Sequence, residues 1–273
     1  MNLSAVSPSV GIMLHLLYLT QIACILAVVG GVLYRRLCRN SLPPVPIIPG
    51  AVFPNVFDVG YTLFFSVLTV LTTTSMIFQG DCFDVKSVNA GSMLLSTLAQ
   101  CLFYLPFLVR FVRLPMVPRP AWGVCRITLC ILLALGGIII PFKLFECSGF
   151  FQYIIEQTAC PEFQSVVIMF RDGDWALRAA VAGAAVIMAP ICEEVVYRGF
   201  VYRILRHYSG RTIAILLSAM LFSVIHGALV QTLPLFIFGV VQCLVYEKSR
   251  TIWLPIAIHA IYNSLSLVMI LLS

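Results

Sequence analysis

Residues 176–206 read ALRAAVAGAAVIMAPICEEVVYRGFVYRILR, and this run decides between a soluble and a membrane-embedded protein. It is longer than the roughly 20 mostly apolar residues that a helix needs to cross a bilayer. Yet it contains two adjacent acids, Glu193 and Glu194, followed by Arg198. A charge at the bilayer centre costs about 2.5 to 3.5 kcal/mol on insertion scales, so ionisable residues there indicate a functional site. The run therefore predicts a membrane helix that carries a site.

The rest of the chain is equally apolar. Of its 273 residues, 61% are hydrophobic and 10% are charged, whereas soluble domains carry about 25% charged residues. About eight stretches approach spanning length. They lie near residues 9–34, 56–79, 89–111, 122–142, 176–206, 211–230, 232–247 and 252–272. The sequence predicts an all-α protein, a polytopic membrane helix bundle of about eight transmembrane helices, with residues 1–273 forming a single membrane domain.

The net charge of +6 is explained by the orientation of the helices in the membrane rather than by binding to an acidic partner. Basic residues cluster at alternate helix ends, as the positive-inside rule describes. The clusters are Arg35, Arg36 and Arg39; Arg110, Arg113 and Arg119; Arg203, Arg206 and Arg211; and Lys248 with Arg250. All four fall on one face if both termini lie outside. We expect an integral, multi-pass protein whose partner is the lipid bilayer, and no nucleic-acid partner.

Two peripheral segments carry further expectations. The first apolar run is too long for the core of a secretory signal and no positive charge precedes it, so we interpret it as a retained helix. Residues 143–175 crowd aromatic residues between charges, which suits either a surface loop or an interfacial or re-entrant helix. Cys147 and Cys160 lie in that segment, and a disulfide between them stays open.

Three polar motifs fall in the last third of the chain. They are Glu193-Glu194-x-x-x-Arg198, Phe222-x-x-x-His226 and His259-x-x-x-Asn263. Residues four positions apart share one face of a helix. Glu194 can therefore pair with Arg198, whereas Glu193, rotated by roughly 100° from its neighbour, can face another helix. His15 and His207 stand apart from the motifs, and we expect them to be non-catalytic.

The motifs share a depth in the predicted bundle. Glu193 lies 13 residues before Arg206, or about 20 Å along a helix. His226 lies 15 residues after Arg211, about 22 Å, and Asn263 lies 13 residues after Arg250, about 20 Å. His259 is one turn nearer the inner face. A single His or Asn in a membrane helix is commonly a packing hydrogen bonder, but two adjacent acids add nothing to packing alone.

The set suits the addition of water to a carbonyl. A glutamate in a poorly hydrated site can act as general base, so Glu193 would take a proton from water that His226 helps to hold. His259 and Asn263, one turn apart, can donate to the oxyanion of a tetrahedral intermediate. Glu194 and Arg198 would offset each other's charge and fix their helix.

These three motifs, in this order on successive membrane helices, resemble those of the CAAX prenyl protease and bacteriocin-processing (CPBP) family, which includes the type II CAAX prenyl endopeptidases. The resemblance covers residues 176–272, the motif-bearing catalytic helices. It implies a metal-independent glutamate endopeptidase with Glu193 and His226 activating water, His259 and Asn263 as oxyanion hole, and Glu194 and Arg198 in support. It also implies a peptide or lipidated protein substrate, such as a CAAX-type prenylated protein.

Other interpretations use the same residues. A zinc peptidase could take Glu and His as ligands, although no His-Glu-x-x-His sequence occurs. A thiol enzyme could use Cys192 with His226 as base, but Cys192 should face another direction from Glu193 and serve packing. A non-enzymatic binding or immunity protein could retain the fold. A transporter could use the acids as a proton relay, but no internal repeat is present. Arg198-Gly199 and the short, loop-poor C-terminal half resemble the prokaryotic branch of the CPBP family, and this resemblance implies a prokaryotic-type cell membrane.

Overall fold

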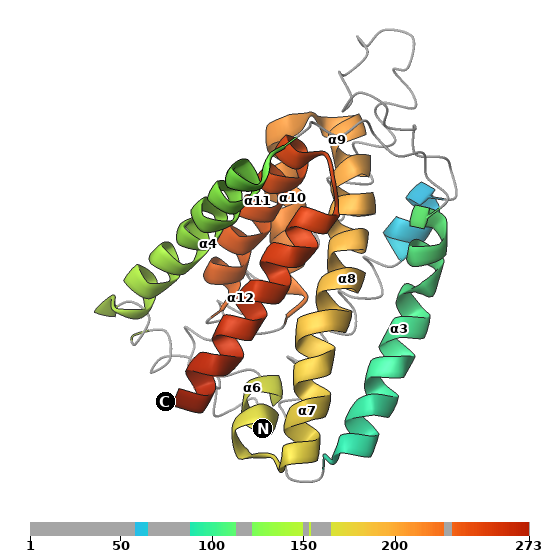
Figure 1. Ribbon diagram of the computed structural model, residues 1–273. Helices are drawn as coiled ribbons and strands as arrows, with labels where there is room; N and C mark the ends of the chain where they lie inside the picture. The colour runs from blue at the N-terminus through green and yellow to red at the C-terminus, as the bar shows by residue number, and fades with distance from the viewer. Residues whose placement is uncertain are drawn as a thin grey trace, which may run out of the picture.

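The computed structural model describes residues 58–64, 88–112, 122–149, 153, 165–226 and 231–272. All the elements in these ranges are helices, which confirms the predicted all-α class (Figure 1). They run in the order α3 (Ala90–Val112), α4 (Val124–Glu146), α6 (Ser165–Asp172), α7 (Trp175–Gly183), η3 (Ala184–Met188), α8 (Ala189–Glu194), η4 (Val195–Tyr202), α9 (Arg203–Ser209), α10 (Arg211–Val224), α11 (Thr232–Ser249) and α12 (Trp253–Leu272). Elements η3 and η4 are π-helices.

Four of these helices are long and apolar enough to cross a membrane, so the chain is an integral membrane protein. They are Ala90–Val112, Val124–Glu146, Trp175–Ser209 and Trp253–Leu272. The third is one continuous helix of 35 residues that joins α7, η3, α8, η4 and α9. α10 is a shorter apolar helix, and α11 completes the set expected from residue 89 onward.

Some predictions lie outside the described residues. These are the helix over 9–34, most of the helix over 56–79, His15, and the Cys160 half of the possible disulfide. One prediction about length is wrong: the helix expected over residues 211–230 ends at Val224. The backbone N–H groups of Ile225 and His226 bond to the carbonyls of Leu221 and Ser223, so the chain tightens into a turn there.

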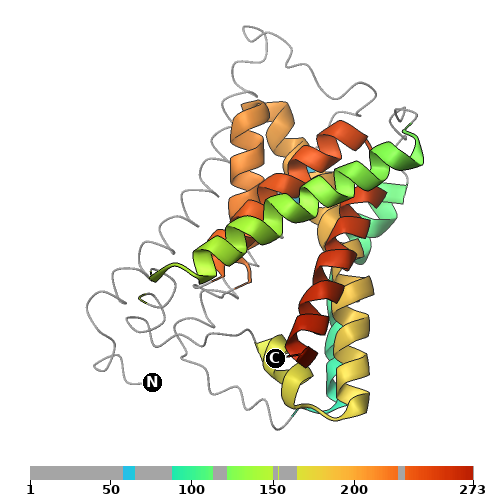
Figure 2. The ribbon, with the colours of Figure 1, turned by 60° about the vertical axis from the view of Figure 1, so that its left-hand side comes forward.

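The long helix forms the centre of the bundle. α3 packs along one side of it, and α12 packs along the other, against η3 and α8 (Figure 1). α10 and α11 form a closely packed pair, and α4 lies obliquely across α11 (Figure 2). The turns from α9 to α10 and from α11 to α12 lie at the same end of the bundle as the end of α3 (Figure 1). The described basic clusters thus share one end, as the charge pattern predicts.

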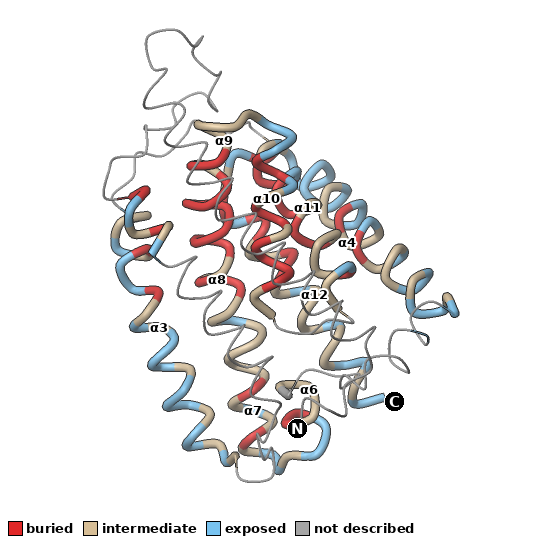
Figure 3. Tube along the Cα trace, turned by 180° about the vertical axis from the view of Figure 1, so that it is seen from behind, coloured by how far each residue is buried: buried red, intermediate tan, exposed pale blue. Residues whose placement is uncertain are grey.

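Burial is concentrated around the middle and upper parts of α8, η4, α10 and α11, whereas α3 and α4 expose much of their surface (Figure 3). Every residue of η4 is buried. The exposed side chains of α3 and α4 are mainly leucine, isoleucine and valine. Lipid tails are as apolar as these side chains, so such a surface is stable in a bilayer.

The acidic loop region is partly helical. α4 continues to Glu146, and α6 places Met169 and Phe170 against α7. Asp174 caps α7, because its carboxylate accepts a hydrogen bond of 2.8 Å from the backbone N–H of Leu177. This end of the segment is therefore a helical hairpin packed on the bundle, while most of residues 150–164 lie outside the description.

Candidate active site

Glu194 and Arg198 form the buried ion pair that their four-residue spacing predicts. Both side chains are essentially inaccessible, and Arg198 Nη1 lies 3.1 Å from Glu194 Oε1. Arg198 Nη2 donates to the carbonyl of Gly239 at 3.3 Å, and its guanidinium lies 4.7 Å from the centre of the Phe222 ring. A buried charge needs this kind of compensation, because an unpaired one is strongly destabilising.

Gly239 makes the second of these contacts possible. A Cβ atom at this position would lie 2.8 Å from the Cα of Ala219, so α10 and α11 approach each other through their backbones. Small residues at helix contacts allow such approach in membrane proteins. The carbonyl of Gly239 thereby comes within reach of Arg198. The sequence motifs did not indicate this partner.

Glu194 also connects three helices. Its Oε1 accepts from His259 Nδ1 at 2.9 Å and from Gln242 Nε2 at 3.4 Å. Gln242 Nε2 further donates to the carbonyl of Pro255 at 2.9 Å, which joins α11 to α12. Sequence reasoning missed Gln242, although a glutamine in the middle of an apolar helix is a signal in its own right. Glu194 Oε1 is thus the centre of a polar network over α8, α11 and α12, while Glu194 Oε2 accepts no hydrogen bond from any described residue.

His259 is oriented by this network. Its Nδ1 faces a carboxylate, which only accepts hydrogen bonds, so the proton belongs on Nδ1. Its ring lies edge-on to Phe238, with centroids 4.8 Å apart. Nε2 therefore points in a fixed direction, toward Glu193 Oε2 at 4.0 Å. In the neutral ring Nε2 can only accept, and it donates only when the imidazole carries both protons.

His226 lies in the turn after α10, not within a helix as expected. Its Nδ1 lies 2.8 Å from the carbonyl of Phe222, which again places the proton on Nδ1. In the Phe222-x-x-x-His226 motif the polar contact is therefore between the His226 ring and the backbone carbonyl of Phe222, at the end of α10. Nε2 is left to face Glu193 Oε2 at 4.0 Å.

Glu193 differs from its neighbour in its exposure and in its partners. Its side chain is 13% exposed, and Oε2 lies 4.0 Å from Nε2 of both His226 and His259, beyond the range of a direct hydrogen bond. Within the described part of the chain, no donor reaches this buried oxygen. The carboxylate is thus aimed at two imidazoles and bonded to neither. The structure brings Glu193, Glu194, Arg198, His226 and His259 into one cluster.

Asn263 is placed differently. Its Nδ2 donates to the carbonyl of Ala185 at 2.7 Å, in η3 rather than in the cluster. Among the described residues it makes no hydrogen bond to the other five predicted site residues. One N–H of its carboxamide is therefore engaged with the backbone, and one remains.

Pro190 explains why Ala185 offers its carbonyl. The backbone N–H of Ala189 bonds to the carbonyl of Ala184, five residues back, in the π-helical pattern. The same pattern would pair Ala185 with Pro190, which has no N–H. The Ala185 carbonyl is left without a helical donor, and Asn263 supplies one from α12. Continuous α-helix was expected here, and Pro190 was the signal against it.

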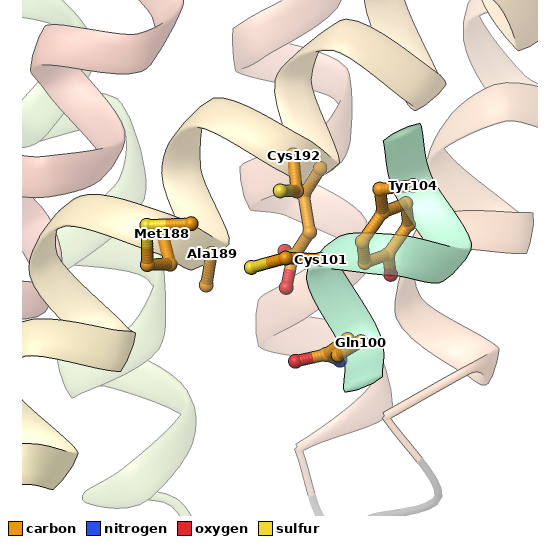
Figure 4. A pocket seen from close by; sticks show the side chains of 7 residues that line it. Gln100, Cys101, Tyr104, Met188, Ala189 and Cys192 are labelled. Carbon is orange, nitrogen blue, oxygen red and sulfur yellow. The ribbon is translucent and has the colours of Figure 1, made fainter. Parts of the chain in front are cut away.

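A small recess opens onto Glu193 from the side of α3. It has an empty volume of about 190 Å³, including space open to the surroundings. Its lining comprises Gln100, Cys101, Tyr104, Met188, Ala189, Cys192 and Glu193 (Figure 4). Cys192 is buried in the hydrophobic core, as expected of a packing residue, and it also lines the recess beside Glu193. The first four helices carry no motif, yet α3 forms one wall of the site.

The described residues offer no clear metal centre. Over residues 58–64, 88–112, 122–149, 165–226 and 231–272, no three His, Cys, Asp or Glu side chains come together as ligands.

Comparison with known proteins places the cluster in a wider context. Residues 175–265, which contain all three motifs, match a family model described as Type II CAAX prenyl endopeptidase Rce1-like. A Bacillus subtilis (strain 168) protein named "Putative membrane peptidase YdiL" is 28% identical over 83 residues. The match covers 30% of this chain and 34% of that protein, so about a third of each is shared. No solved structure matches the chain significantly.

Proposed function

From the membership of residues 175–265 in the CPBP family of membrane peptidases, we propose that this protein is an intramembrane endopeptidase in which Glu193 activates water to hydrolyse a peptide bond. The observation that carries the proposal is the placement of Glu193 Oε2, 4.0 Å from Nε2 of both His226 and His259. A carboxylate at that distance from two imidazoles can hold a water molecule jointly with them.

The tautomer of His226 supports its role. Since the proton on Nδ1 is directed at the carbonyl of Phe222, Nε2 can accept a hydrogen bond from water. Water would then donate one proton to Glu193 and one to His226, leaving an oxygen lone pair for the substrate carbonyl. Glu193 takes the first proton as the C–O bond forms and delivers it to the nitrogen of the leaving amine as the C–N bond breaks.

The oxyanion of the tetrahedral intermediate needs donors. His259 can donate from Nε2 when it carries both protons, with its Nδ1–H directed at the carboxylate of Glu194 at 2.9 Å. Asn263 contributes the N–H that Ala185 does not occupy, so its contact with η3 fixes the direction of the carboxamide. Arg198 balances the charge of Glu194 and holds it against α11 and α12.

We propose further that the hydrolysis requires no metal and that the substrate comes from the membrane. The substrate class is a peptide or lipidated protein segment, CAAX-type prenylated proteins included, and the compartment is a prokaryotic-type cell membrane. The support is the family assignment of the motif-bearing helices and their burial in an apolar bundle. Zinc as cofactor and a non-enzymatic binding role are the competing proposals.

The test compares peptide termini in membranes. Cells that express the protein and cells that express Glu193→Gln at equal level are compared by sequencing the N- and C-termini of membrane proteins. We expect a set of termini that is present with the unaltered protein and lost with Glu193→Gln, and retained with Cys192→Ser. Identical termini in the first two samples would overturn hydrolysis at Glu193.

A further inference from the structure

One polar side chain outside the motif-bearing helices lines the same recess as Glu193. Gln100 lies ten residues after Ala90, near the middle of α3, a helix of 23 residues. Around it Leu95, Leu98 and Leu102 are between 62% and 70% exposed, as expected of a surface in contact with lipid. Polar residues at such depth are costly in hydrocarbon and mark functional sites by default.

Gln100 is directed at the site rather than only at lipid. It lines the recess together with Cys101 and Tyr104 of the same helix (Figure 4), and Glu193 of α8 also belongs to the lining. Gln100 itself is exposed. Within the described ranges no donor or acceptor bonds to its carboxamide. This contrasts with Gln242, whose carboxamide is bonded to both Glu194 and Pro255.

The chemistry of the recess matches a peptide. Each backbone N–H and C=O that enters hydrocarbon must find a partner, since an unpaired group costs several kcal/mol. A glutamine carboxamide offers an acceptor and two donors, the complement of a backbone amide. Charged groups other than Glu193 do not line the recess, so it offers no site for a charged headgroup.

The size of the recess limits what else it can hold. Its empty volume of about 190 Å³ includes space open to the surroundings, so the space that protein encloses is much smaller than that of a ligand pocket. The lining from Cys101, Met188, Ala189 and Cys192 is apolar and soft. The recess therefore has no room for a lipid chain, and its polar groups, Gln100 and Glu193 among them, are what it offers to a substrate.

We propose that α3 is the substrate-binding wall of the site, where Gln100 hydrogen-bonds the backbone of the substrate residue next to the scissile bond. The inference rests on the proposed hydrolysis at Glu193 and names the group that positions the peptide. It places a binding determinant on a helix outside the motif-bearing segment.

The experiment uses the full-length protein reconstituted in lipid vesicles. The probe is a peptide that spans the terminus most dependent on Glu193 in the membrane comparison. For Gln100→Leu we expect KM to rise about threefold to tenfold, the effect of losing one neutral hydrogen bond, with kcat within about twofold. Leucine at mid-helix also favours insertion, so poor assembly is not expected.

Ser96→Ala is the matched control, because Ser96 lies one turn away on α3, is exposed, and does not line the recess. Its KM should stay unchanged. An unchanged KM in Gln100→Leu overturns the binding role, and so does a fall in kcat at constant KM, because the residue would then act on the chemical step. If the peptide termini are the same with Glu193→Gln as with the unaltered protein, the proposed hydrolysis itself is wrong. That result is seen before Gln100 is tested.

Discussion

The two sides of α8 present adjacent carboxylates in opposite environments. On the inner side, Glu194 is fully buried and bonded to Arg198, Gln242 and His259. On the recess side, Glu193 is partly exposed and bonded to no described residue. The inner carboxylate is held by an arginine and by residues of two neighbouring helices, whereas the carboxylate that lines the recess is held by no hydrogen bond from a described residue. Stability and reactivity are thus divided between neighbouring residues of one helix.

The largest expected effect comes from removing the reactive acid. Glu193→Gln should lower the cleavage rate by about 100-fold to 10,000-fold, the usual contribution of a general base. The unfolding temperature in detergent should stay close to that of the unaltered protein, because the lost oxygen accepts no hydrogen bond within the described chain. If Glu193→Gln lowers the unfolding temperature as well as the activity, the environments of Glu193 and Glu194 are not separate.

Breaking the inner network should have the opposite signature. Arg198→Gln leaves Glu194 buried without its counter-charge and should cost about 3 to 5 kcal/mol of unfolding free energy. Reversible unfolding in mixed detergent measures this. In the double variant with Glu194→Gln, most of that loss should return, because both charges are absent. Equal losses in the single and double variants would contradict the ion-pair interpretation.

A smaller effect should test whether Pro190 is the reason that the Ala185 carbonyl is free to accept a hydrogen bond from Asn263. Asn263→Leu leaves the Ala185 carbonyl unpaired and should cost about 1 to 3 kcal/mol of unfolding free energy. Pro190→Ala restores a backbone N–H that can serve this carbonyl, so Asn263→Leu should cost less in that background. A double-mutant cycle measures the difference, and additive effects would disconnect the two residues.

The smallest effect is expected from chelation. Incubating the reconstituted protein with a strong zinc chelator should leave the rate of peptide cleavage unchanged, since the proposed chemistry uses water bound by Glu193 and His226. The control is a known zinc peptidase treated in the same vesicles. Activity that is lost with chelator and restored by zinc would replace the glutamate mechanism.

The sequence was sufficient for the class of fold and for the pairing within one helix. Apolar length predicts the membrane helices, and a four-residue spacing predicts the contact between Glu194 and Arg198, because both depend only on local geometry. The meeting of Glu193 with His226 required equal depth in neighbouring helices, and the charge clusters supplied that estimate. His226 shows the limit of the method, since α10 ends before it is reached.

Other features of the site depend on packing between helices. The carbonyl of Gly239 reaches Arg198 because α10 and α11 approach through small residues, and no spacing within one helix encodes that approach. Likewise Asn263 bonds to Ala185 because a π-helical segment precedes Pro190, whereas an ideal α-helix leaves no such carbonyl free. Gln242 and Gln100 could have been found as isolated amides in apolar helices, but the partners of Gln242 could not.

The helix Trp175–Ser209 has 35 residues and therefore measures about 50 Å, whereas the hydrocarbon core of a bilayer is about 30 Å thick. Such a helix must tilt, extend into the headgroups, or thicken the surrounding lipid. The depth of Glu193 below the aqueous phase thus depends on the thickness of the host membrane as well as on the protein. We therefore expect the length of the lipid acyl chains to affect the reaction. Vesicles of graded bilayer thickness should change access to the Glu193 carboxylate, although the protein stays the same.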